Sequence, residues 1–189
     1  MNRTGLIRLG GLATMVGALL FVAAPLFSRY FPQAMEPLPA MEAFLVVALI
    51  LMPVGIVGFH ALQGRNYGRV GLAGFWMAVV APLAVALGSA SYLWWGSVFG
   101  ASLLWLALPV GPIVLLVGFA LYGVATLRVR VLPRWCGVIF IVAMPVALGS
   151  SIVGAFASVF VVFGFAWLAL GYALWSQRDT SAERLSRVR

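Results

Sequence analysis

Charge is scarce in this chain, and this scarcity decides its class. Charged residues make up only 8% of the 189 residues, whereas a soluble domain carries roughly 25%. Hydrophobic residues make up 64%, and the mean hydropathy is +1.11. This composition excludes a soluble globular domain, a disordered chain and a collagen-like chain. It predicts an integral membrane protein.

Several reactive residue types are absent or occur once. Lysine is absent, which excludes a retinal Schiff base, a P-loop lysine and a lysine nucleophile. His60 is the one histidine, so one chain cannot form a bis-histidine haem site or a histidine-rich metal site. Cys136 is the one cysteine, which excludes an intramolecular disulfide and a Cys-based zinc or iron–sulfur site. We therefore expect no cofactor, no metal and no enzymatic activity.

Six apolar runs are close to, or longer than, the about 20 residues that a membrane-spanning helix requires. They cover residues 9–27, 41–62, 70–92, 102–127, 135–153 and 155–175. The sequence thus predicts an all-α, polytopic six-helix transmembrane bundle. It forms one domain over residues 1–175, followed by a short basic tail at 176–189.

The arginines indicate how the bundle is oriented. If six spans alternate across the membrane, eleven of the twelve arginines fall on one side, and only Arg29 falls on the other. The positive-inside rule places that side, with both termini, in the cytoplasm. The net charge of +8 is then a feature of topology rather than of nucleic-acid binding. We expect the cell inner (plasma) membrane as the location.

Two helical hairpins share short motifs. Val57-Gly58-Phe59 recurs at residues 117–119, Arg69-Val70 recurs at 130–131, and residues 85–89 recur at 146–150. These matches predict that the second and third helices correspond to the fourth and fifth, as repeated hairpins. Biased apolar composition also produces chance matches, so both explanations stay open.

Prolines mark the middle helices: Pro53, Pro82, Pro112 and Pro145. Because proline removes a backbone hydrogen bond, each is a candidate kink. Broken helices at matching places in two repeats are typical of a transport site, whereas membrane helices also tolerate proline as a packing kink. The middles of the spans contain no charged residue, which argues against ion-coupled transport.

Two further polar features have alternative interpretations. Arg29, Glu36 and Glu42 form the one charged group expected on the outer side, either as a solvated or salt-bridged rim or as acid–base residues. His60 lies near the inner end of the second span, where it is a candidate axial ligand to haem or a chlorin. The alternative is a hydrogen bond from His60 to a carbonyl or to a headgroup phosphate.

Arginines flank the inner ends of the middle spans. Each can attract an anionic headgroup with about 1 kcal/mol. The candidate lipid-headgroup contacts are Arg65, Arg69, Arg128, Arg130 and Arg134.

The stretch at residues 121–137 reads LYGVATLRVRVLPRWCG. Its ATLR-x-R-x-LPRW-x-G core resembles a cytoplasmic loop of small six-helix integral membrane proteins of high-GC bacteria. The resemblance covers about 15 residues. It implies the six-helix architecture and brings no activity with it.

These features predict a non-catalytic integral membrane protein, either an accessory subunit or a binder of lipid or another apolar molecule. The expected partners are membrane lipids, and also another membrane protein or a second copy of the chain. The alternative is a small transporter or channel for a neutral or apolar solute. A membrane enzyme that uses Glu42 or His60 is a third, less favoured hypothesis.

Overall fold

The structure, a computed structural model, describes residues 3–30, 39–64, 68–95, 107–152 and 156–186. These ranges contain six α-helices and no strand. The helices are α1 (Arg3–Tyr30), α2 (Pro39–Gln63), α3 (Gly68–Trp95), α4 (Ala107–Val129), α5 (Arg134–Ile152) and α6 (Phe156–Ser186). The prediction of an all-α, six-helix bundle is confirmed.

Five of these helices are long and apolar enough to cross a membrane. The exception is α5, whose described apolar stretch, Arg134–Ser150, is shorter. The whole α5 helix has 19 residues, which is about 28 Å at the helical rise per residue. This length is close to the hydrocarbon thickness of about 30 Å. The chain is therefore a multi-pass membrane protein.

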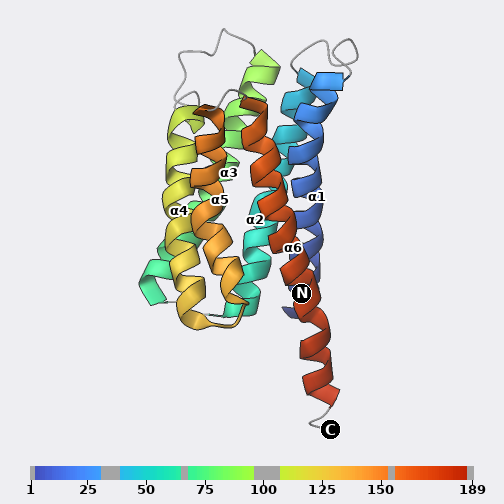
Figure 1. The fold of residues 1–189 in the computed structure, drawn as a ribbon, viewed down its shortest axis with the longest axis vertical. Helices are drawn as coiled ribbons and strands as arrows, with labels where there is room; N and C mark the ends of the chain where they lie inside the picture. Colours follow the sequence, from blue (N-terminus) through green and yellow to red (C-terminus); the bar gives the residue numbers. More distant parts are fainter. Residues whose placement is uncertain (1–2, 31–38, 65–67, 96–106, 153–155, 187–189) are drawn as a thin grey trace.

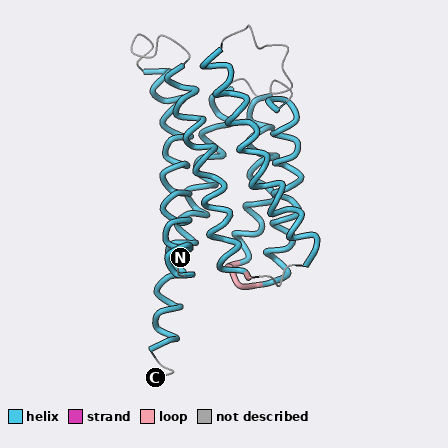
Figure 2. Tube along the Cα trace, turned by 180° about the vertical axis from the view of Figure 1, so that it is seen from behind, coloured by secondary structure: helices cyan, strands magenta, loops and turns pink. Residues whose placement is uncertain are grey.

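The last helix differs from its expected bounds. Residues 176–189 are expected as a tail, but α6 continues past Trp175 as far as Ser186. The added segment contains Gln, Arg, Ala, Glu and Leu, which favour helix, and it lacks glycine and proline. The end of an apolar run predicts where the helix leaves the lipid. It does not predict where the helix ends, because a helix can continue into water. Figures 1 and 2 show this part of α6 extending beyond the other helices.

The helices form a closed ring. Each packs against its neighbours in the chain, and α1 also packs against α6. Figure 1 places the N-terminus, the C-terminus and the short α4–α5 turn toward the same end of the ring, and Figure 2 shows this turn from behind. We call this end, which carries Arg69, Arg128, Arg130 and Arg134, the arginine end, and the opposite one the far end.

Glycines bring neighbouring helices into backbone contact. A methyl group at Gly10 of α1 would lie 2.7 Å from the Cα of Gly58 on α2. A methyl group at Gly74 of α3 would lie 2.6 Å from the backbone nitrogen of Tyr122 on α4, and one at Gly123 of α4 would lie 2.7 Å from a backbone oxygen of α5. Small residues permit such close approach in membrane helices.

The repeated Val-Gly-Phe motif occupies similar places in both copies. Gly58 of α2 contacts Gly10 on α1, the preceding helix, and Gly118 of α4 contacts Met77 on α3, its own preceding helix. The phenylalanine that follows each glycine is fully buried. Repeated hairpins would produce this arrangement, and the duplication itself stays a prediction.

Aromatic side chains fill the interior of the ring around Phe140 of α5. The ring centroids of Phe59 and Tyr122 each lie 5.3 Å from that of Phe140, and those of Phe119 and Trp167 each lie 5.7 Å from it. These side chains come from α2, α4 and α6. Because they converge from separate helices, the aromatic cluster closes the middle of the bundle.

Candidate functional site

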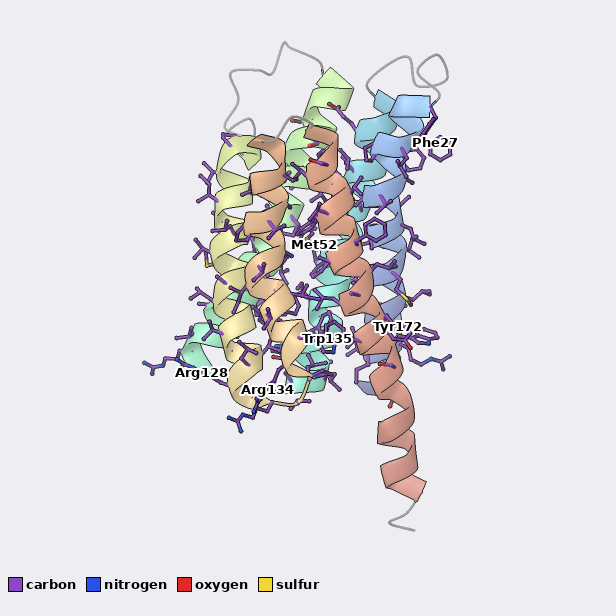
Figure 3. All side chains as sticks on the ribbon, in the orientation of Figure 1. Phe27, Met52, Arg128, Arg134, Trp135 and Tyr172 are labelled. Carbon is purple, nitrogen blue, oxygen red and sulfur yellow. The ribbon has the colours of Figure 1, made fainter. Side chains whose placement is uncertain are left out.

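Cationic side chains gather at the arginine end. Arg69, Arg128, Arg130 and Arg134 are all exposed there. Figure 3 shows Arg128 and Arg134 near the ends of α4 and α5. The candidate contact Arg65 lies outside the described residues. The structure thus brings four of the five predicted headgroup contacts to one end of the ring.

The turn between α4 and α5 is held by backbone contacts. The Arg130 N–H donates to the Thr126 carbonyl oxygen at 3.2 Å, and the Cys136 N–H donates to the Pro133 carbonyl oxygen at 3.0 Å. Leu132 is buried between these two points. These contacts fix the backbone of the turn, and with it the Cα positions of the flanking arginines.

Arg130 ends α4 in the left-handed backbone region, with a φ of 56°. The same type of helix end closes α2, where Gly64 has a φ of 69° and its N–H donates to the His60 carbonyl oxygen at 3.0 Å. Glycine is the usual residue at such a position because it has no Cβ. The two helix ends therefore share a conformation but differ in side chain.

Amphipathic aromatic residues lie in the same part of the bundle. Trp135 of α5 is 43% exposed, and Tyr172 of α6 is 65% exposed. Figure 3 shows both toward the arginine end. Tryptophan and tyrosine with this exposure are typical of the interface between lipid and water. Their placement fits the aromatic belt of a membrane protein.

A buried hydrogen-bond chain joins α2 to α4 just inside the arginine end. Gln63 Nε2 donates to Thr126 Oγ1 at 2.9 Å, and Thr126 Oγ1 donates to the Tyr122 carbonyl oxygen at 2.8 Å. Gln63 and Thr126 are 3% and 2% exposed. The Oε1 of Gln63 and the Nε1 of Trp167 are buried without a hydrogen-bond partner.

The sequence analysis did not predict this buried hydrogen-bond link, although the sequence contains a signal for it. Gln63 continues the helical spacing of the buried residues Met52, Ile56 and Phe59 along one face of α2. A polar residue on a buried face is the informative exception in an apolar helix. Applied to α2, this rule indicates Gln63 as an interior residue.

The far end of the same face is less buried. On α2, Leu45 and Leu49 are only partly buried, whereas Met52, Ile56 and Phe59 toward the arginine end are fully buried. On α6 the change occurs between two neighbouring interior positions. They are Phe160, which is partly buried, and Phe163, which is buried. Along these faces of α2 and α6, the side chains are therefore more buried toward the arginine end than toward the far end.

The four candidate prolines lie inside continuous helices. Pro53 and Pro82 are buried, Pro112 is half-buried and Pro145 is exposed. Apolar residues next to them fill the interior, and Figure 3 shows one of these, Met52, in the middle of the bundle. The prolines of the two proposed repeats thus differ in their surroundings.

Two of the remaining candidate groups, His60 and Glu42, lie at opposite ends of α2. His60 is half-buried, and its ring centroid lies 4.3 Å from that of Phe75 on α3. Glu42 is half-buried near the far end, and its Oε2 is buried without a hydrogen-bond partner. The side chain of Arg29 and all of Glu36 lie outside the described residues. Among the described residues, no three His, Cys, Asp or Glu side chains come together as metal ligands.

Comparisons with protein-family models, with curated proteins and with solved structures give no match to this chain. The resemblance of the α4–α5 turn to a loop of other six-helix membrane proteins therefore stays a prediction.

Proposed function

We propose that this chain is a non-catalytic integral membrane protein that binds lipid at its arginine end. The observation that carries the proposal is the coincidence of four exposed arginines with exposed Trp135 and Tyr172 at one end of an apolar bundle. Guanidinium groups bind phosphate through paired hydrogen bonds, and exposed tryptophan and tyrosine side chains lie at the level of the lipid headgroups. Lipid is the partner that offers both chemistries at this place.

The net charge supports an anionic lipid. The sequence has twelve arginines and four acidic residues, which gives a net charge of +8. Each arginine near an anionic surface contributes about 1 kcal/mol. Together the exposed arginines would favour anionic over zwitterionic lipid.

The positive-inside rule places the arginine end in the cytoplasm. A cysteine introduced at the exposed Val131, in a Cys136→Ser background, should react with an impermeant thiol reagent only after cells are permeabilised. A cysteine at the exposed Ala43, near the far end, should react in intact cells. The opposite pattern would invert the orientation.

Lipid selectivity tests the function directly. The protein in maltoside micelles is titrated with short-chain phosphatidylglycerol or with phosphatidylcholine of the same chain length, and bound lipids are counted by native mass spectrometry. We expect at least fivefold tighter binding of phosphatidylglycerol, which corresponds to about 1 kcal/mol. Replacement of Arg69, Arg128, Arg130 and Arg134 together by glutamine should remove the preference. Equal binding of both lipids by the unmodified protein would overturn the proposal.

An accessory role beside another membrane protein, or self-association, would use the apolar perimeter instead. That perimeter includes exposed Trp76 and Phe165, at 57% and 59%. A second protein that remains bound after lipid exchange, without any selectivity for anionic lipid, would favour this role over lipid binding.

Passage of a neutral or apolar solute is the second candidate function. It is favoured by the looser interior at the far end, where Leu45, Leu49 and Pro112 are only partly buried. Such a transporter would take up a neutral solute into proteoliposomes. The uptake would be lost when Pro53 and Pro112 are both replaced by alanine.

A further inference from the structure

We propose that the α4–α5 turn is itself the binding site for the phosphate headgroup of an anionic phospholipid, with Arg128, Arg130 and Arg134 as its ligands. This inference rests on the proposed function and locates it in one turn of the chain. Arg128 lies in the last turn of α4, Arg130 in the connection, and Arg134 is the first residue of α5. Three exposed cations therefore lie within one short, anchored segment.

The conformation of Arg130 argues that its side chain has a role. At the equivalent end of α2 the chain uses Gly64, which adopts the left-handed region without strain. At the end of α4 the same region is occupied by arginine, whose Cβ makes it unfavourable. The backbone gains nothing from arginine here, since Thr126 accepts the same backbone hydrogen bond from any residue but proline. The reason for arginine at this position therefore lies in its side chain, which is exposed.

The surroundings of the turn select lipid over a soluble anion. Exposed Val131 and Trp135 flank Arg130 and Arg134, and exposed Val138 follows one turn later on α5. An indole at the interface and aliphatic side chains beside it contact acyl chains, while the guanidinium groups reach the phosphate. A free anion would contact the arginines alone and leave these apolar surfaces without a partner. A phospholipid would contact the arginines with its headgroup and the apolar side chains with its acyl chains.

The fold anchors this surface from beneath. Leu132 at the middle of the turn and Cys136 at the start of α5 are both buried, at 4% and 0% exposed. The turn is thus packed into the core by Leu132, which lies between Arg130 and Arg134, and by Cys136, which follows Arg134. Preorganised cations bind phosphate with a smaller loss of conformational entropy than cations on a free tail.

The exchange of Arg130 for glycine separates ligand binding from folding. Arg130→Gly removes one cation and relieves the left-handed strain, so the apparent unfolding temperature should rise while affinity for phosphatidylglycerol falls about fivefold. Arg134→Gln should lower the affinity by a similar factor without raising the unfolding temperature. Arg8→Gln is the matched control: Arg8 is exposed on α1, which lies across the ring from α4. It removes the same charge and should leave the affinity unchanged.

The test uses the full chain in maltoside micelles, short-chain phosphatidylglycerol as the probe, and native mass spectrometry as the readout. If the unmodified protein prefers phosphatidylglycerol but Arg130→Gly and Arg134→Gln bind it as well as Arg8→Gln does, the site proposal is wrong and general lipid binding stands. If inorganic phosphate displaces the lipid at equal concentration, recognition is of phosphate alone and the commitment to lipid is overturned. If the unmodified protein shows no preference, the proposed function itself fails.

Discussion

The two ends of the bundle are packed differently, although the same six helices form both. Toward the arginine end, glycines such as Gly58 and Gly74 contact backbone atoms of a neighbouring helix. Toward the far end, the atoms nearest to a methyl group at Gly111 would belong to the side chain of Val85, with the Ala81 carbonyl oxygen farther away at 3.8 Å, and Gly149 has no neighbour within 4 Å. The interior changes in parallel, from fully buried Phe59 to partly buried Leu45 on one face of α2.

This difference indicates where a rigid site can be built and where the bundle can change shape. Backbone-to-backbone contacts leave no flexible side chain to absorb movement, so the arginine end should resist local opening. Contacts through side chains, and partly buried interior residues, permit rearrangement at lower cost. The proposed headgroup site lies at the rigid end, and any entry of a solute would occur at the looser end.

The largest effect should come from adding one methyl group at each end. In Gly74→Ala the new Cβ would lie 2.6 Å from the Tyr122 backbone nitrogen and 2.9 Å from the Gly118 carbonyl oxygen. Helices α3 and α4 must separate, which should reduce the free energy of unfolding by about 3 kcal/mol. Gly149→Ala meets nothing within 4 Å and should instead stabilise its helix by roughly 0.5 kcal/mol. Titration with sodium dodecyl sulfate in mixed micelles measures both. An equal reduction of the free energy of unfolding in the two variants would show that the two ends are packed alike.

Sequence reasoning predicted the six helices because lipid imposes long apolar runs on every span. Alternation of the spans also predicts that residues such as Arg69 and Arg134 share one end, and the structure has both at the arginine end. It did not indicate the contact of Gln63 with Thr126, because the two residues are far apart in the chain and meet only when α2 and α4 flank α3. It did not indicate the conformation of Arg130, because arginine is uncommon in the left-handed region.

An intermediate effect should follow from breaking the α2–α4 link at the arginine end. Thr126→Val removes the acceptor of Gln63 Nε2, which would then be buried without a partner. The expected loss in the free energy of unfolding is about 1.5 kcal/mol. Gln63→Leu should cost less, about 0.5 kcal/mol, because Thr126 Oγ1 keeps its bond to the Tyr122 carbonyl oxygen. The double variant should be no worse than Thr126→Val alone. A larger loss for Gln63→Leu than for Thr126→Val would contradict the assigned direction of the hydrogen bond.

The smallest effect should come from the corresponding polar link at the far end. Ser158 Oγ of α6 lies 3.1 Å from both the carbonyl oxygen and the Oγ of Ser150 on α5. Ser150 Oγ also donates to the Ala147 carbonyl oxygen at 2.6 Å, and that bond survives in Ser158→Ala. Both serines are only partly buried, so their remaining polar groups can be solvated. We expect a loss of about 0.5 kcal/mol in the same titration. Ser176→Ala, which removes a bond within α6 alone, is the matched control and should have no measurable effect. A loss for Ser158→Ala as large as that for Thr126→Val would mean that the far end is held as firmly as the arginine end, and solute entry there would lose its structural support.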